Sequence, residues 1–545
     1  MRSLGTGVLA CVFVVGLAGC GGGGGGSRSG SGSGQGGGPI TPAANVTVAI
    51  TSAAINASIA QGDPYSATVS GTWSATNLGS GAVYLQISDS AGTFALPAIQ
   101  AAPPNGAFSY ALPVAPTVAS GERSGTITVK ACKDTACTNA HAGTSGSVGY
   151  RLAVNSVPEW ETVQGNAAHN GYVPITLDAS KFAKAWEWRP PHVPPVRTIW
   201  LGMPVTGSDG VYVNAMPYYD DHDASDQLVA LEEQSGATRW VKSVGTDADP
   251  AYATSAAYAG GRLYYGKGLY TFNTNNTYAG LIALQANTGS TAFSSEAIQL
   301  ANGVAAPTPF GGNIYMSGAF KFPARGYASI DGTTGNPQWA TPLVQTVQGR
   351  PWATPSVDSQ NLYFHSACCL EILDRQSGAV VASITNPSAD ATYTTRSLFS
   401  PTLLGSRGNV LALALTPTAG KRLLSSFNIA GKSLEWTSAL DYSGFPAVAN
   451  GVIYVSRIEN NHVSLHALNE TTGQALWTWT PPEAEGQSTQ LYNVVATRNL
   501  VFFSAADSVS QTGRLWALDI ASRQPVWSYP AFGPLAISAK RMLFL

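Results

Sequence analysis

Apolar and polar positions between Leu228 and Trp527 repeat one pattern seven times. Each copy has a short apolar run, a polar or acidic residue, a turn usually closed by Thr-Gly or Ser-Gly, and in most copies a final aromatic residue. The turn residues lie 42 to 53 positions apart, at Gly236, Gly289, Gly335, Gly378, Gly431, Gly473 and Arg523. A further pair of apolar strands precedes each copy. Each repeat therefore holds four strands, the content of one propeller blade.

Two apolar remnants flank the seven repeats. The chain ends on a strand pair between Pro534 and Leu545, and the segment from Phe182 to Trp188 is an apolar strand with no pair before it. Joining the remnants would complete an eighth blade and remove the exposed edge of an open ring. We therefore predict an all-β chain with an eight-bladed β-propeller over residues 156–545, with seven blades as the alternative.

Residues 43–155 follow a different pattern, in which apolar and polar positions alternate strictly over short runs. Examples are Val83, Leu85 and Ile87 in one run, and Ile127 and Val129 in another. A period of two, interrupted by Gly, Pro, Asn and Ser, predicts antiparallel strands with one face in water. About 110 residues of this kind suit an immunoglobulin-like β-sandwich, although the inter-sheet Cys, Trp, Cys signature is absent.

The N-terminus has the order of an export signal: Arg2, an apolar run from Val8 to Gly16, and then small residues. The motif Leu17-Ala18-Gly19-Cys20 resembles the bacterial lipoprotein cleavage box. This resemblance implies a signal peptide over residues 1–19, a lipid on Cys20 and, because Gly21 is not acidic, sorting to the outer membrane. Ordinary cleavage with an incidental Cys20 is the alternative. The Gly/Ser-rich residues 20–42 then form a flexible tether.

Charge and cysteine content limit the partners and the cellular compartment that we expect for this chain. The 29 basic and 31 acidic residues are nearly balanced and sparse, so nucleic acid is not an expected partner. Of the six cysteines, Cys11 would leave with the signal and Cys20 would carry the lipid. Two close pairs remain in an oxidising compartment, Cys132 with Cys137 and Cys368 with Cys369, and a disulfide is favoured for the first pair.

Two further motifs resemble the pyrroloquinoline-quinone-like propeller family. One is the repeat phrase Ala-Leu-Asp-x-x-x-Gly-x-x-x-Trp, present as Ala467-Leu-Asn…Gly473…Trp477 and near Trp527. The other is the leading segment Trp160…Gln164-Gly-Asn166…His169…Gly171-Tyr172. The repeat residues are expected to be structural: the tryptophans wedge between neighbouring blades, and the glycines close tight turns that need a positive φ.

The family that these motifs resemble contains quinoprotein dehydrogenases, which hold the quinone and calcium in the central channel, and non-enzymatic scaffolds such as the propeller lipoprotein of the outer-membrane barrel-assembly machinery. The compact propeller and lipid anchor favour the scaffold. We therefore predict a monomeric, non-enzymatic lipoprotein with no cofactor, binding a protein or extended ligand at the cell envelope. The alternatives are a quinoprotein oxidoreductase that uses pyrroloquinoline quinone with calcium, and a polysaccharide-binding surface protein.

Candidate site residues are few, and no local motif for a catalytic residue is present. Dehydrogenases of the family carry a vicinal disulfide against the quinone, but Cys368-Cys369 lies between a blade's second and third strands, so a structural role is favoured. Four aspartates in one loop could suggest calcium, although a solvated acidic loop is favoured. They are Asp220, Asp221, Asp223 and Asp226.

The preferred binding candidates are Arg and aromatic residues in three links between blades. These links precede an inner strand and are expected to open on the funnel of the propeller, where guanidinium groups and aromatic faces could bind a ligand. The alternative is that these side chains only pack the links against the blades. The residues are Arg197, Trp200, Arg350, Trp352, Arg396 and Phe399.

Overall fold

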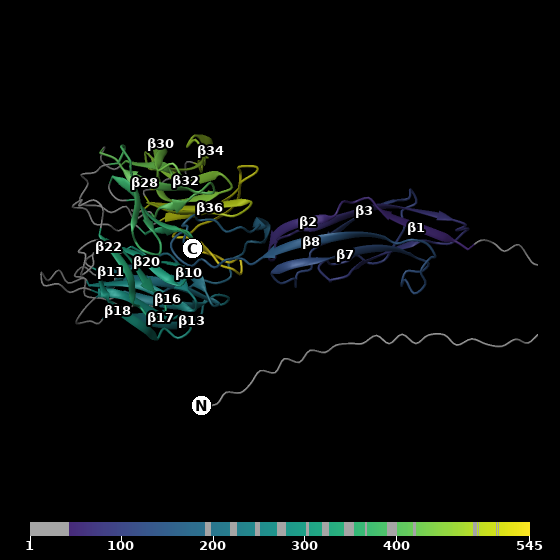
Figure 1. Cartoon of the computed structure of the whole chain (residues 1–545), viewed down its shortest axis with the longest axis horizontal. Helices are drawn as coiled ribbons and strands as arrows, with labels where there is room; N and C mark the ends of the chain where they lie inside the picture. Colours follow the sequence, from purple (N-terminus) through teal and green to yellow (C-terminus); the bar gives the residue numbers. More distant parts are fainter. Residues whose placement is uncertain are drawn as a thin grey trace, which may run out of the picture.

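The computed structural model describes residues 43–190, 198–218, 226–245, 251–269, 279–300, 305–318, 326–342, 354–365, 368–389, 401–417, 421–482, 488, 490–507, 510 and 512–545. Within these ranges the chain is all-β except for one 3-10 helix, Ala179–Lys181, as the alternating patterns predict. No helix in this part of the chain has the length and apolar character needed to span a membrane. Figure 1 shows two bodies, an elongated sandwich and a propeller.

The sandwich consists of two sheets that share one apolar core. One sheet has the order β1 (Asn45–Ile50), β3 (Ser66–Thr76) and β6 (Ala107–Pro113); the other has β2 (Ile55–Ala60), β8 (Gly146–Asn155), β7 (Gly121–Cys132), β4 (Tyr84–Asp89) and β5 (Gln100–Ala101). Buried and exposed positions alternate along β8. Val69, Ile127 and Val129 are fully buried in the core. The immunoglobulin-like assignment stays a prediction.

Each complete blade has four main strands, A to D, and A is innermost because it contacts the segment at the centre of the ring. Blade 1 is β10 (Val205–Gly207), β11 (Gly210–Tyr218), β12 (Gln227–Glu232) and β13 (Thr238–Ser243); blade 2 is β15 (Ala257–Ala259), β16 (Arg262–Leu269), β17 (Ala279–Gln285) and β18 (Thr291–Leu300); blade 3 is β19 (Thr308–Phe310), β20 (Asn313–Gly318), β21 (Gly326–Asp331) and β22 (Pro337–Pro342); blade 4 is β23 (Ser356–Val357), β24 (Asn361–His365), β25 (Cys369–Asp374) and β26 (Val380–Thr385). Two extra strands, β9 (Thr198–Leu201) and β14 (Ala251–Ala253), pair with β11 and β16.

The next three blades repeat this order. Blade 5 is β27 (Leu403–Leu404), β28 (Asn409–Leu415), β29 (Arg422–Asn428) and β30 (Ser433–Asp441); blade 6 is β31 (Ser443–Ala449), β32 (Val452–Glu459), β33 (His462–Asn469) and β34 (Ala475–Trp479); blade 7 is β35 (Gln490–Ala496), β36 (Leu500–Asp507), β37 (Thr512–Asp519) and β38 (Pro525–Tyr529). Because neighbouring strands are antiparallel, the A–B and C–D turns lie on one face of the ring, the turn face. The B–C and D–A links lie on the opposite face, the link face.

Tryptophans join neighbouring blades in the way that the repeat predicts. Trp240 donates its Nε1–H to the carbonyl of Ala286 in the next blade (3.0 Å). Its ring lies over Gly289, where an added Cβ would come within 2.7 Å of the ring. Gly289 also has a positive φ of 67°, which a side chain would disfavour. The same contact recurs for Trp186 on Gly236, Trp339 on Gly378 and Trp436 on Gly473.

The ring closes by joining the two chain ends. The C-terminal strands β39 (Ala536–Ile537) and β40 (Leu543–Phe544) form a small two-stranded sheet, the eighth blade. Trp186 packs on Phe544 in this sheet and donates its Nε1–H to the carbonyl of Glu233 in blade 1 (2.9 Å). The prediction of a strand from Phe182 to Trp188 is wrong, because this segment has no ladder pairing. Its side chains nevertheless complete the eighth blade.

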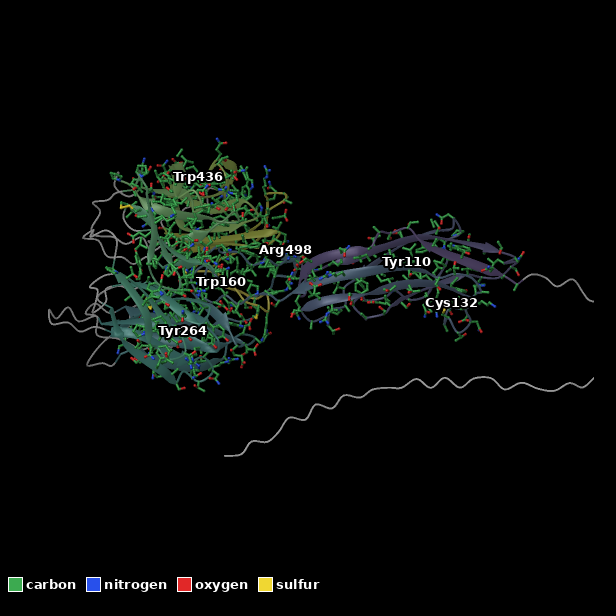
Figure 2. The ribbon with its side chains drawn as sticks, in the orientation of Figure 1. Tyr110, Cys132, Trp160, Tyr264, Trp436 and Arg498 are labelled. Atoms are coloured by element: carbon green, nitrogen blue, oxygen red, sulfur yellow. A yellow bond between two sulfur atoms is a disulfide. The ribbon has the colours of Figure 1, made fainter. Side chains whose placement is uncertain are left out.

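Residues 159–175, the central segment, close the middle of the ring. Trp160 is 1% exposed and lies inside the propeller (Figure 2). The backbone carbonyls of the segment accept hydrogen bonds from the A strands of blades around the ring: those of Trp160, Glu161, Ala167, Ala168, Asn170 and Gly171 bond to Thr206, Tyr258, Val357, Leu404, Val448 and Ala496. Thr162 reaches blade 3 by donating to the carbonyl of Pro307. The segment thus contacts seven blades.

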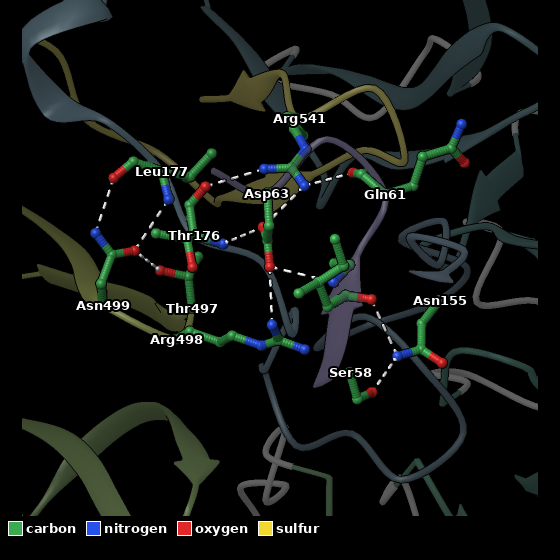
Figure 3. A network of polar contacts seen from close by, with 12 residues as sticks. Ser58, Gln61, Asp63, Asn155, Thr176, Leu177, Thr497, Arg498, Asn499 and Arg541 are labelled. Carbon is green, nitrogen blue, oxygen red and sulfur yellow. Dashed lines mark hydrogen bonds and ion pairs between the residues drawn. The ribbon is translucent and has the colours of Figure 1, made fainter. Parts of the chain in front are cut away.

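The sandwich is fixed to the propeller through Asp63, whose side chain is only 5% exposed. Its carboxylate pairs with Arg498 (2.8 Å) and Arg541 (2.9 Å), and it accepts a hydrogen bond from the Thr176 backbone N–H (2.8 Å). Figure 3 shows these groups converging on Asp63. Arg498 and Arg541 lie in the A–B turns of blades 7 and 8, so the sandwich docks on the turn face. We call this contact the junction.

Candidate functional site

The binding candidates of the link face fall almost entirely outside the described residues. Arg197, Arg350, Trp352, Arg396 and Phe399 all lie there. Trp200 lies in β9, where its backbone pairs with Met216 in β11. The ligand site on the link face therefore stays a prediction.

The acidic loop is described at one residue only, because Asp220, Asp221 and Asp223 lie outside the described ranges. Asp226 is fully buried. Its carboxylate accepts hydrogen bonds from the Ala253 backbone N–H (2.8 Å) and from Asn214 Nδ2 (3.4 Å). These bonds connect blade 1 to the extra strand of blade 2. In the part of the chain that the structure describes, no three His, Cys, Asp or Glu side chains could together hold a metal ion.

The structure joins both cysteine pairs by disulfides, Cys132 with Cys137 and Cys368 with Cys369. Cys132 lies toward the end of the sandwich away from the propeller (Figure 2). The lipidation candidate Cys20 falls outside the described residues.

The vicinal disulfide lies at the link face of blade 4, next to a buried polar group. Cys368 and Cys369 are 8% and 1% exposed. The carbonyl of Cys368 accepts the backbone N–H of Asn386 (2.7 Å), directly after β26. Asn386 also donates from Nδ2 to Nε2 of His365 (3.4 Å), and burial lowers the pKa of His365 to about 4. The pair therefore belongs to a packed region where the B–C link meets the D–A link.

The calcium that the family's dehydrogenases hold beside the quinone requires several oxygen ligands. The described residues bring no three His, Cys, Asp or Glu side chains together, and Asp226 is already engaged by blade 2. The quinone and calcium site of those enzymes therefore stays an untested alternative for this chain.

A cavity opens on the turn face between blades 2, 3 and 4. Its volume is 820 Å³. The walls are the A–B turns of the three blades, the C–D turn of blade 3 and part of the central segment. The side chains used below are Glu161, Arg262, Tyr264, Phe310 and Asp358.

Most polar groups of this cavity already have protein partners. Arg262 donates to the carbonyls of Gly332 (2.8 Å) and Thr333 (2.7 Å). Tyr264 donates its hydroxyl to the same Gly332 carbonyl (2.8 Å). The carboxylate of Asp358 accepts the backbone N–H of Asn361 (2.7 Å), among other bonds within its turn. These bonds hold the walls of the cavity in place.

Glu161 differs from these groups. Its backbone is fixed, because its N–H donates to the carbonyl of Gly165 (2.6 Å) and its carbonyl accepts from Tyr258 (2.6 Å). Its carboxylate has no hydrogen-bond or ion-pair partner among the described residues. Burial, and then the neighbouring charge of Glu159, raise the pKa of Glu161.

Sequence reasoning did not identify Glu161 or the cavity. The Trp160…Gln164 motif marked the segment only as a fold signal. The Gly260-Gly261 and Gly311-Gly312 pairs indicate tight turns. Nothing in the sequence says that three such turns would enclose a space beside a glutamate.

Comparison with known families gives a match to a family model. The model described as outer membrane protein assembly factor BamB matches residues 224–479 and 421–541. No curated protein matches the chain.

Three solved structures are similar to this chain over about two thirds or more of its length. A quinohemoprotein alcohol dehydrogenase, ADHIIG from Pseudomonas putida HK5, is 13% identical, with 68% of this chain and 72% of that chain covered and a TM-score of 0.44. The quinohemoprotein alcohol dehydrogenase from Comamonas testosteroni is 14% identical, with 70% and 75% covered and a TM-score of 0.45. Dihydro-heme d1 dehydrogenase NirN in complex with DHE is 14% identical, with 74% and 71% covered and a TM-score of 0.43.

The prediction that the chain is not an enzyme is contradicted by these neighbours, which are dehydrogenases. A fold does not by itself decide between an enzyme and a scaffold, so compact size and blade number do not argue against catalysis. At 13% to 14% identity the similarity shows the fold alone and assigns no reaction to this chain.

Proposed function

This chain belongs to the family of the outer membrane protein assembly factor BamB, and from this premise we propose that its propeller is a binding platform in the assembly of outer-membrane proteins. The observation that carries the proposal is the junction. The sandwich and its Asp63 ion pairs occupy the turn face at blades 7 and 8. A partner protein or other extended ligand then binds the opposite link face, which points away from the sandwich.

The proposed position in the cell envelope follows from the N-terminal sequence. A lipid on Cys20 and the tether of residues 20–42 hold the sandwich near the outer membrane. The rigid sandwich then separates the propeller from the lipid. This arrangement supports a platform that acts at a fixed distance from the membrane surface.

Complementation of a gene deletion tests the platform. The amount of folded outer-membrane barrel proteins, measured by heat-modifiable migration of membrane fractions, is expected to fall in the deletion strain. Wild type restores it, and a variant with alanine at the six link-face candidates does not: Arg197, Trp200, Arg350, Trp352, Arg396 and Phe399.

The matched control for complementation is Arg151→Ala on the sandwich, whose side chain is 73% exposed and pairs with Glu122. This variant is expected to restore barrel proteins fully. Unchanged barrel proteins in the deletion strain would exclude the proposed role in assembly. Full complementation by the six-alanine variant would exclude the link face as the binding surface.

A second candidate, a quinone-dependent oxidoreductase, is favoured by one observation, the disulfide between Cys368 and Cys369. Titration of the purified chain with pyrroloquinoline quinone and calcium, followed by absorbance, melting temperature and dye-linked alcohol oxidation, tests it. Saturable binding with turnover that Cys368→Ser removes would support this function. A chain that neither binds the quinone nor turns over would exclude it.

A further inference from the structure

We propose that the turn-face cavity binds an organic cation, whose ammonium or guanidinium group pairs with the carboxylate of Glu161. This inference goes beyond the platform function, which uses the opposite face of the ring. It rests on the shape of the cavity, the chemical state of Glu161 and the apolar surface beside it.

The cavity is built by fixed elements. The carbonyl acceptors of Arg262 lie in the C–D turn of blade 3, so this arginine bridges blades 2 and 3. The central segment forms the remaining wall and is itself bonded to the inner strands. A volume of 820 Å³ lies within the range of about 300–1,000 Å³ that small-molecule sites occupy. The space is therefore large enough for a ligand and is already formed.

Glu161 is the one acidic group of this cavity that the fold leaves unused within the described residues. Asp358 is held by its own turn, and Arg262 donates to two carbonyls and forms no ion pair with Glu161. The nearby Glu159 accepts hydrogen bonds from Thr206 (2.7 Å) and Ala539 (3.3 Å). A partly buried carboxylate without a partner carries a desolvation cost, which a bound cation offsets.

The chemistry of the walls favours an organic cation over a bare metal ion. No group of three His, Cys, Asp or Glu in the described residues could coordinate a metal, so Glu161 would act alone. Phe310, which is partly exposed, supplies apolar surface to the same cavity, and Pro309 and Ile314 lie buried beneath its lining. Arg375 lies 5.3 Å from the centre of the Phe310 ring, so one face of this ring is taken by a cation.

The rim of the cavity is open to solvent at two exposed turn glycines, so an alkyl chain would meet no obstruction there. A Cβ added at Gly260 or Gly312 would meet nothing within 4 Å. A linear alkylammonium could lie along these turns while its charged end reaches Glu161, as hydrocarbon stems do beside charged groups. A free polyamine and a lysine side chain of another protein share this chemistry.

The test uses the purified full-length chain and two probes in isothermal titration at low ionic strength. Spermidine represents a free polyamine, and N-acetyl-lysine methylamide represents a protein side chain. We expect saturable binding of at least one probe. Glu161→Gln is expected to weaken it by about tenfold or more, because a charge-assisted bond is lost.

The matched control is Glu122→Gln, which removes an exposed carboxylate of the sandwich and is expected to leave binding unchanged. Melting temperature verifies that Glu161→Gln is folded, and added probe should raise it for wild type only. Binding of spermidine alone would assign the site to polyamines, and binding of the lysine derivative would assign it to a protein partner. Absence of saturable binding, or equal affinity in Glu161→Gln, would overturn the proposal.

Discussion

Two places on the turn face treat a carboxylate in opposite ways. At the junction, Asp63 is almost inaccessible and is paired with Arg498 and Arg541. At the cavity of blades 2 to 4, Glu161 lies among turns of the same kind without a cationic partner in the described residues. The difference teaches that the turn face serves two purposes. One side is used for attachment of the sandwich, and the other side retains a partly exposed carboxylate that pairs with none of the described residues.

The largest effect is expected from breaking the junction with Asp63→Ala. Removal of the acid leaves two arginines facing each other across a partly buried contact, so the free energy of unfolding should fall by about 3 kcal/mol. Urea denaturation followed by tryptophan fluorescence measures this. The control is Glu122→Ala, which breaks an exposed ion pair and should cost less than about 1 kcal/mol. Equal losses in the two variants would show that the Asp63 contacts do not fix the sandwich.

Acid should lower the stability of the centre of the ring, which lies between the junction and the cavity. Burial lowers the pKa of His169 from 6.5 to about 4, although its contacts with the carbonyls of Val163 and Pro355 oppose this shift. The unfolded chain therefore takes up a proton first as the pH falls below 6.5. The contribution of neutral His169 to the free energy of unfolding is fully present above pH 6.5 and is lost as the pH falls toward 4.

Unfolding in urea at pH 7 and pH 5 measures this loss for His169. We expect a decrease of about 2 kcal/mol from this residue, reflecting about 1.5 pKa units between pH 6.5 and pH 5. His365 has a pKa lowered to about 4 as well, so wild type alone does not separate the two. His169→Gln should therefore lose less stability on acidification than wild type by about that amount. An identical pH dependence would mean that His169 is not buried as a neutral group.

The smallest effect on stability is expected at the cavity, from Glu161→Gln. Because the pKa of Glu161 is raised, its ionisation opposes folding, and the folded state is favoured as the pH falls through that raised value. Glu161→Gln should leave stability unchanged at low pH and increase it slightly at pH 7, by less than about 1 kcal/mol. Differential scanning calorimetry at the two pH values measures this. A clear loss of stability at pH 7 would show that the carboxylate has a structural partner.

The repeats of the propeller could be predicted because each blade places its signals within one stretch of sequence. The turn glycine and the following aromatic of a blade lie a few residues apart, as in Gly236 and Trp240. The period of the repeat then brings Trp240 to Gly289 in the next blade. The eighth blade was predicted from its two remnants for the same reason. The exact role of Phe182 to Trp188 was missed, because side-chain docking without ladder pairing leaves the same apolar pattern as a strand.

The candidate site residues differ in whether the sequence could identify them. Arg and aromatic residues of the links were selected from local composition, and their arrangement is still a prediction. Asp63 and Glu161 carry no local signal, because an Asp before a proline and a Glu beside a tryptophan are ordinary turn and loop features. The partner Arg498 is 435 residues from Asp63 along the chain. No spacing rule connects residues that far apart.

The sequence by itself determined the all-β class, the blade period and the contacts between neighbouring blades, since these depend on short-range alternation and regularly spaced Gly and Trp residues. Only the tertiary structure decided which face of the ring the sandwich occupies, where the central segment closes the channel, and that the Glu161 carboxylate has no partner among the described residues. The physical reason is that burial and charge pairing depend on what the closed ring brings together. A side chain becomes a partner or an unused group only when distant turns meet around it.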